Sequence, residues 1–263
     1  SNRAHSTIYP HTPKIDAYEW YLRGLALKRG GATERTLARE YFSRAIAADS
    51  TFAAAHAALT RVYIDDAGAT PGDYRESYAR AEQAAQKAVA LDDSLAAAHA
   101  ALGWAYSINR KWASAQTELR RAITLDPRAS DAYEGLALVY QWTERPRELL
   151  AVAKTGLEID PFNYSAVRRM ALALSMNNRC DEAIQLLRPL QTLSAPAEVA
   201  GVITGQCYAT KKMWPEAIAE FRWAMTDGSK GRARMALAFL GYAQARAGQG
   251  RPPGNRHGSG QHR

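Results

Sequence analysis

The side chains that could carry out chemistry in this chain are few and scattered. Six histidines and two cysteines are the potential metal ligands or nucleophiles, and only His56 and His99 lie in the regular part of the sequence. They occupy matching places in two near-copies, Phe52–Leu59 and Leu95–Leu102, where no carboxylate or thiol completes a zinc ligand set. We therefore predict packing roles for both histidines, with no metal site and no cofactor.

Catalytic signatures are missing as well. The chain has no phosphate-binding glycine loop, no dinucleotide-binding glycine pattern, no zinc-protease motif and no nucleophile elbow. The acidic stretch Asp65–Asp73 lacks the spacing of a calcium loop. Pro71 and Gly72 favour a turn there, with Asp73 capping the helix that follows. The sequence predicts a protein that is not an enzyme.

Cys180, Cys207 and Asn163 each fit a structural role. The cysteines are predicted at the start of one helix and inside the next, and a single pair does not make a disulfide framework. We expect both thiols to act as small, half-buried apolar groups. Asn163-Tyr164-Ser165 has the form of a glycosylation site, but its place at a predicted helix start indicates a helix cap.

The elements that would position any site are repeated helices. Two adjoining segments, 96–129 and 130–163, are each 34 residues long and align without gaps. Leu102 and Tyr106 match Leu136 and Tyr140, and further matches follow after a short break. Apolar residues three or four apart mark one face of a helix, so each segment predicts two short helices.

The same frame extends over Ala17–Ala247 in six units and a last single helix, about Arg232–Ala247. The positions that recur in the units are small, aromatic or apolar: Trp20, Gly24, Ala38, Phe42 and Ala45; Ala81, Ala85 and Ala88; Leu102, Gly103, Tyr106, Ala115, Leu119 and Ala122; Leu149, Ala153 and Gly156; Ala183 and Leu187; Gly205, Tyr208, Ala217, Phe221 and Ala224; Leu240 and Gly241. This pattern resembles the tetratricopeptide repeat (TPR), a unit of the same length. The resemblance implies an all-α, right-handed superhelical solenoid of about six helix-turn-helix units plus one terminal helix.

The concave groove implied by the resemblance, lined by the first helix of each unit, is where we expect a partner to bind. The expected contacts are first-helix residues outside the packing positions: Tyr21, Arg61, Trp104, Asp131, Glu134, Gln141, Trp142 and Arg168. Small neighbours, Ala54, Ala57, Ala97 and Ala100, leave room there. Trp104 and Trp142 beside arginines suit an extended or helical peptide, or they cover neighbouring helices. The Lys and Asn clamp of the chaperone-binding TPR subset is absent.

Composition divides the chain into three expected parts. Residues 1–16 predict an arm or linker, 17–247 the solenoid, and 248–263 a disordered tail, because the tail has no aliphatic or aromatic residue. The net charge of +8 is dispersed among acidic residues, so we expect no nucleic-acid partner. No segment is apolar enough to predict a membrane span. We expect a cytoplasmic protein, or a periplasmic one if the chain is cut from a membrane-anchored regulator.

The leading functional hypothesis is a non-enzymatic scaffold that binds a protein or peptide segment in the groove. The segment Ile15–Gly24 also resembles the start of repeat regions in bacterial regulators, which implies the interaction or sensor module of a signalling protein.

Two alternatives come from other parts of the frame. The incomplete last unit leaves an apolar edge around Met235, Leu237 and Phe239, which predicts homo-oligomerisation, for example as a homodimer. A small-ligand sensor is the other alternative. In that case the groove would close on a metabolite between four of the expected contacts, Trp104, Glu134, Trp142 and Arg168.

Overall fold

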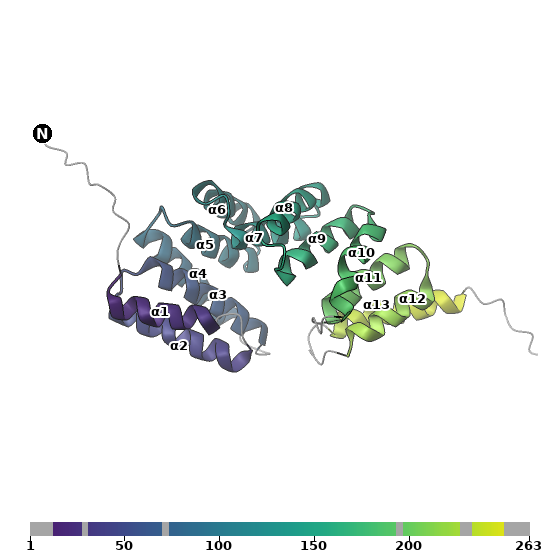
Figure 1. Ribbon diagram of the computed structural model, residues 1–263, viewed down its shortest axis with the longest axis horizontal. Helices are drawn as coiled ribbons and strands as arrows, with labels where there is room; N and C mark the ends of the chain where they lie inside the picture. The colour runs from purple at the N-terminus through teal and green to yellow at the C-terminus, as the bar shows by residue number, and fades with distance from the viewer. Residues whose placement is uncertain (1–12, 28–30, 70–73, 193–196, 227–232, 250–263) are drawn as a thin grey trace, which may run out of the picture. The chain divides into compact units, whose positions relative to one another are not determined.

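The computed structural model describes residues 13–27, 31–69, 74–192, 197–226 and 233–249 (Figure 1). These ranges hold thirteen α-helices and no strand, so the predicted all-α class and its succession of helix pairs are confirmed. The first helix begins at Ile15 and the last ends at Gln249, two residues outside the predicted solenoid at each end. Most of the predicted arm (1–12) and tail (250–263), together with the predicted turn at Pro71–Asp73, lies outside the described residues.

Residues 1–159 form one compact unit, here called unit 1. Its helices are α1 (Ile15–Leu27), α2 (Ala32–Ala48), α3 (Ala53–Ala69), α4 (Tyr74–Leu91), α5 (Ala96–Ile108), α6 (Trp112–Leu125), α7 (Ser130–Trp142) and α8 (Pro146–Ile159). They pack as four consecutive hairpins, α1 with α2 through α7 with α8. The first helices α3, α5 and α7 also pack against one another in order, which places them side by side along the unit (Figure 1).

Residues 160–263 form the second compact unit, unit 2. Its helices are α9 (Tyr164–Met176), α10 (Cys180–Thr192), α11 (Ala197–Thr210), α12 (Trp214–Ala224) and α13 (Ala233–Gln249). The first four make two hairpins, and α13 packs against both helices of the second hairpin. Thus α13 takes the place of the first helix of a further hairpin.

The turns inside four successive hairpins share one backbone conformation. Arg110, Glu144, Asn178 and Lys212 have φ between 54° and 61° and follow one another at intervals of 34 residues. In each turn the amide of the next residue donates to the carbonyl five residues back, as Lys111 N does to Tyr106 O at 2.9 Å. A left-handed residue with this bond ends a helix by satisfying its last carbonyls. The 34-residue period of the sequence is therefore repeated in the backbone conformation of these turns.

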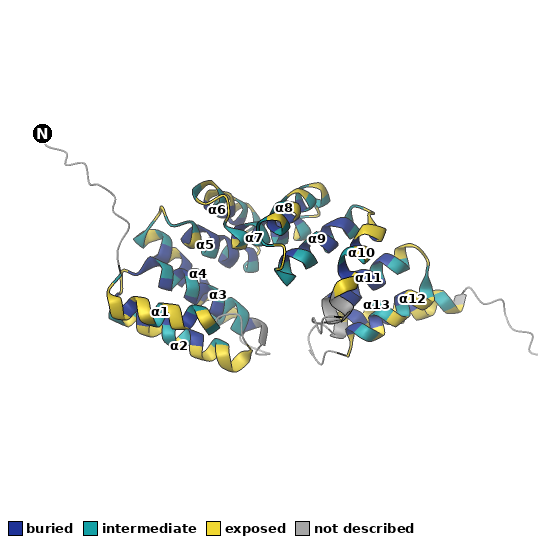
Figure 2. Cartoon of the chain, viewed as in Figure 1, coloured by how far each residue is buried: buried dark blue, intermediate teal, exposed yellow. Residues whose placement is uncertain are grey.

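A large side chain packed against a glycine is the recurring contact of the core. The predicted packing positions of the second helices are buried: Ala38, Phe42, Ala45, Ala81, Ala85, Ala88, Ala115, Leu119, Ala122, Leu149, Ala153, Gly156, Ala183, Leu187, Ala217, Phe221 and Ala224 (Figure 2). A methyl group added to Gly24 would lie 2.5 Å from the ring of Phe42, and one on Gly103 would lie 2.4 Å from Cγ of Leu119. Only glycine lets the two helices of a hairpin approach this closely.

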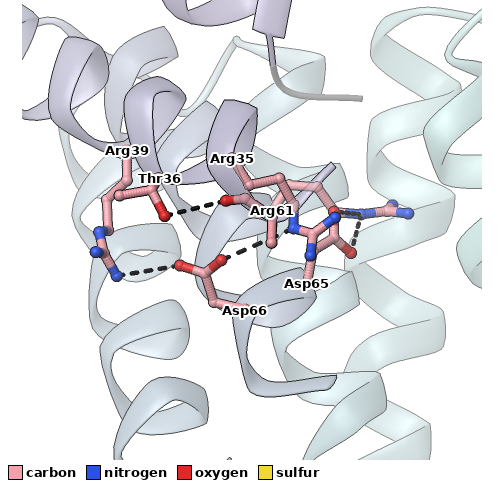
Figure 3. Close-up of polar contacts among 7 residues, drawn as sticks. Arg35, Thr36, Arg39, Arg61, Asp65 and Asp66 are labelled. Carbon is pink, nitrogen blue, oxygen red and sulfur yellow. Dashed lines mark hydrogen bonds and ion pairs between the residues drawn. The ribbon is translucent and has the colours of Figure 1, made fainter. Parts of the chain in front are cut away.

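The end of α3 differs from the sequence-based prediction. We predicted a loop from Asp65 onward, whereas the helix continues to Ala69. Arg61 Nε donates to the Asp65 carboxylate at 3.2 Å, and Asp66 pairs with Arg39 of α2 at 3.1 Å and with Arg35 at 3.8 Å (Figure 3). These ion pairs, two of them between helices, explain why the acidic residues extend the helix instead of ending it.

Candidate functional site

Unit 1 contains a hollow of about 310 Å³, here called the unit 1 hollow. Its described lining comes from the first helices α1, α3, α5 and α7 and from the segment between α6 and α7. Many of the lining residues are alanines of α3 and α5: Ala54, Ala57, Ala58, Ala96, Ala97, Ala100 and Ala101. Because these side chains end at Cβ, they leave space between the larger residues on either side.

Trp104 and Arg61 form one wall of the unit 1 hollow. Trp104 is only 8% exposed, and its indole Nε1 donates to the carbonyl of Asp131 at 2.8 Å. The Arg61 guanidinium lies 4.5 Å from the centre of the Trp104 ring, an arrangement that attracts a cation to an aromatic face. Nε of the same arginine donates a hydrogen bond to the carboxylate of Asp65. The tryptophan is therefore part of the packing between α5 and α7, the second of the two alternatives for Trp104, and it also lines the hollow.

Tyr21 of α1 also lines the unit 1 hollow. The centroid of its ring lies 5.0 Å from that of Phe52 and 5.9 Å from that of Phe42. The ring of Tyr21 is therefore packed against two other aromatic rings. Burial raises the pKa of the Tyr21 hydroxyl above its usual value, and the nearby Tyr18 adds to this. The hydroxyl therefore stays protonated at physiological pH and can donate a hydrogen bond.

The lining of the unit 1 hollow carries both signs of charge. Arg61 and Arg128 supply the cations, and Asp126 and Asp131 supply the carboxylates. Asp126 and Arg128 were not predicted as contacts, because they lie between helices, where helical periodicity says nothing about direction. Four of the predicted contacts, Tyr21, Arg61, Trp104 and Asp131, line this hollow.

The other predicted contacts do not line the unit 1 hollow. Glu134 and Gln141 lie on α7 and are half-buried, and Trp142, the last residue of α7, is 61% exposed. Arg168 belongs to α9 of unit 2 and is half-buried. Their part in partner binding stays a prediction.

Unit 2 has a larger hollow of about 670 Å³. It lies along the first helices α9, α11 and α13, and its described lining is Ser175, Gln206, Ala209, Thr210, Phe221, Ala238, Phe239 and Tyr242. The described part of this lining contains no charged residue, in contrast to the lining of the unit 1 hollow. The two hollows therefore differ in the chemistry that they could recognise.

The two repeat histidines have the same structural role. His99 is 4% exposed, lies 2.7 Å from Glu118 through Nδ1, and lies 2.9 Å from the carbonyl of Asp93 through Nε2. His56 lies 3.3 Å from the carbonyl of Ser50, also six residues earlier. Each histidine ring lies at hydrogen-bond distance from a backbone carbonyl in the turn before its helix. This confirms the predicted packing role. Within the described ranges, no three metal-binding side chains lie together.

The cysteines are more buried than predicted and are both free. Cys207 Sγ donates to Ser175 Oγ at 3.4 Å. Burial raises the pKa of the Cys207 thiol to about 12, and a hydrogen bond with Cys180 contributes. Asn163 caps α9 as predicted, since its side-chain oxygen accepts a hydrogen bond from the backbone amide of Ser165 at 2.9 Å.

We expect Cys207 to resist alkylation in the folded chain at pH 9. Only the thiolate reacts, and a pKa of about 12 leaves on the order of one thiol in a thousand ionised at that pH, whereas most thiols in an unfolded chain are ionised. Iodoacetamide labelling, quantified by peptide mass spectrometry with and without urea, measures this. Equal labelling rates in the two samples would contradict the burial of Cys207.

No protein-family model and no curated protein sequence matches the chain. Solved structures do match. YrrB, described as a TPR protein with an unusual peptide-binding site, is 20% identical with a TM-score of 0.52, over 76% of this chain and 97% of that one. PilF of Pseudomonas aeruginosa is 18% identical with a TM-score of 0.60, over 85% and 97%.

A third structure, the Cut9–Hcn1 hetero-tetramer of the APC/C, has the higher TM-score of 0.67 at 16% identity. The match covers 87% of this chain and 46% of that chain, so the present chain spans less than half of that protein's length. At these identities the likeness concerns the fold.

Proposed function

We propose that this chain, which has the fold of TPR proteins, is a non-enzymatic scaffold that binds a peptide segment of a partner protein in the unit 1 hollow. The observation that carries the proposal is the lining of that hollow, which combines many alanines with Tyr21, Trp104 and side chains of both charges. Binding sites place an apolar anchor in a pocket and surround it with polar groups. No bond-breaking chemistry is needed for this role.

The size and charge of the hollow favour a peptide. A volume of about 310 Å³ stands at the lower end of the range for small-molecule sites, roughly 300–1,000 Å³, and suits an apolar side chain of a longer ligand. Arg61, Arg128, Asp126 and Asp131, which all line the hollow, would then pair with polar groups of the peptide around the anchor. The peptide-binding site named for YrrB supports this reading by analogy of fold.

The binding role also suits a module of a larger regulator. The resemblance of Ile15–Gly24 to repeat regions of bacterial regulators supports a place in signalling, where the hollow would recruit a partner segment. This assignment extends the scaffold proposal and depends on it.

Filling the hollow is expected to weaken peptide binding at least about tenfold, since tight packing of the anchor carries much of the affinity at such sites. Ala97 is the suitable position, because it lines the hollow and is exposed, so Ala97→Trp adds bulk without entering the core. Peptides would first be selected from a random displayed library, and their affinities then measured by fluorescence anisotropy.

The matched control is Ala151→Trp, an exposed alanine on the second helix α8 that does not line the hollow. It should leave the affinity unchanged. Selection of no peptide, or equal affinities for the Ala97→Trp and native chains, would refute the proposed site. A library of metabolites would be screened alongside the peptides. Binding of a metabolite and of no peptide would instead identify a small-ligand sensor.

A further inference from the structure

Exposed large apolar side chains gather on two helices, one in each unit. Six of the eleven such residues in the described ranges lie on α1 and α13: Ile15, Tyr18 and Leu22, and Met235, Leu237 and Tyr242. The remaining five are spread singly over other segments. Scattered exposed apolar residues are ordinary, whereas several on one helix mark a contact surface. On α13, Leu237 lies on the side of Gly241, and Met235 and Tyr242 lie on another side of the helix.

The open face of α13 has the form of a site for another helix. Gly241 occupies the packing column of Gly24, Gly103 and Gly205. A methyl group on each of those three would lie within 2.5 Å of an atom of a large side chain on the next helix, but a methyl group added to Gly241 would meet no described atom of another element within 4 Å. Leu237, one turn before Gly241, is 57% exposed. This surface is therefore ready to receive a helix with a large apolar side chain.

The exposed face of α1 supplies such side chains. Ile15, Tyr18 and Leu22 are 78%, 48% and 47% exposed and are spaced three and four residues apart, so they form one stripe along the helix. The opposite side of α1 is fixed in unit 1 through the buried Ala17 and Gly24. The stripe is thus held on a packed helix, and the exposed residues of α1 are yellow in Figure 2.

We propose that α13 of one copy of the chain binds α1 of a second copy, so that the chain associates head to tail. The lengths agree, since helices of 13 and 17 residues are about 20 and 25 Å long. The charges agree as well: α1 carries Asp16 and Glu19 against a single Arg23, while α13 carries two arginines and no acid. Residues 250–263 cannot supply the apolar side chains, because that segment has no aliphatic or aromatic residue.

The two surfaces differ, and this fixes the symmetry of the assembly. A contact between unlike surfaces leaves one free α1 and one free α13 after each association. Such an assembly grows into open series or closes into a ring, whereas a contact of α13 with α13 would stop at a dimer. The chain's average mass in solution should therefore rise beyond that of a dimer with concentration.

The test uses two variants that each remove one surface. Leu22→Glu places a carboxylate in the apolar stripe of α1, and Gly241→Arg fills the open space on α13. Both positions are exposed, and arginine favours a helix more than glycine does, so both variants should fold as the native chain does by circular dichroism. Sedimentation velocity should show each variant alone as a monomer, with association weakened at least about tenfold.

Mixing the two variants is the decisive measurement. The Leu22→Glu copy keeps an intact α13 and the Gly241→Arg copy keeps an intact α1, so the mixture should form a complex of two chains and grow no further. Tyr74→Glu, a change at a 49% exposed residue of α4, is the control and should assemble as the native chain does. The proposal would be overturned if the native chain stayed monomeric. In that case α1 and α13 would be covered by the ends of the same chain or by other proteins. A Leu22→Glu variant that still dimerises would also overturn it and would indicate contact between two copies of α13.

Discussion

Replacing Leu119 by alanine is expected to lower the free energy of unfolding by about 3–5 kcal/mol, the upper part of the range for buried leucines. Leu119 is fully buried between Gly103 of α5 and Gly135 of α7. A methyl group on either glycine would lie 2.4 or 2.5 Å from a Leu119 atom. Since the glycines have no side chains that could move into the vacated space, the cavity should remain largely open. Urea unfolding followed by circular dichroism measures the change.

Leu37→Ala is the matched control for this loss. Leu37 lies on α2 and is 39% exposed, so its truncation removes less buried area than that of Leu119 and should cost about 1 kcal/mol or less. A loss below about 1.5 kcal/mol for Leu119→Ala would mean that the helices close around the cavity. The contact between leucine and glycines would then be a loose one.

A second pair of substitutions should change stability in opposite directions. Gly205→Ala would place a methyl group 2.5 Å from the Phe221 ring, which is 1% exposed and stacks on Phe239 at 5.7 Å. Because that ring has no space to move, we expect a loss of about 1–3 kcal/mol. Gly241→Ala meets no described atom within 4 Å, so the better helix propensity of alanine should raise stability by up to about 1 kcal/mol.

The comparison works because both glycines hold the same place in a first helix of unit 2 and receive the same change. Thermal and urea unfolding of the two variants should be compared at a dilution where the native chain is monomeric, so that association does not contribute. If Gly205→Ala and Gly241→Ala were equally stable, glycine would not be required where two helices approach closely.

The sequence was sufficient for the hairpins and their core because both depend on local periodicity. Leu119, Phe42 and Phe221 recur in one column, and all three are buried as predicted. The end of α3 could not be predicted in this way. It depends on Asp66 meeting Arg35 and Arg39 of another helix, and such contacts are not visible in the helical period.

The candidate site was predictable in part for the same reason. First-helix positions outside the packing columns led to Tyr21 and Arg61, both of which line the unit 1 hollow. The sequence left two alternatives open for Trp104 and could not decide between them, because its indole donates to a carbonyl 27 residues away in the next hairpin. Arg128 was missed because residues between helices carry no periodic signal of direction.

The left-handed turns at Arg110, Glu144, Asn178 and Lys212 have a consequence for how such a chain can change over evolutionary time. Each turn satisfies the end of its own helix, and each recurs after 34 residues. A duplication or deletion of one whole period therefore joins a turn to an equivalent turn and creates no new kind of junction. Recombination in steps of this length can lengthen or shorten the array while every helix keeps its neighbours' geometry, so that array length and binding chemistry can evolve separately.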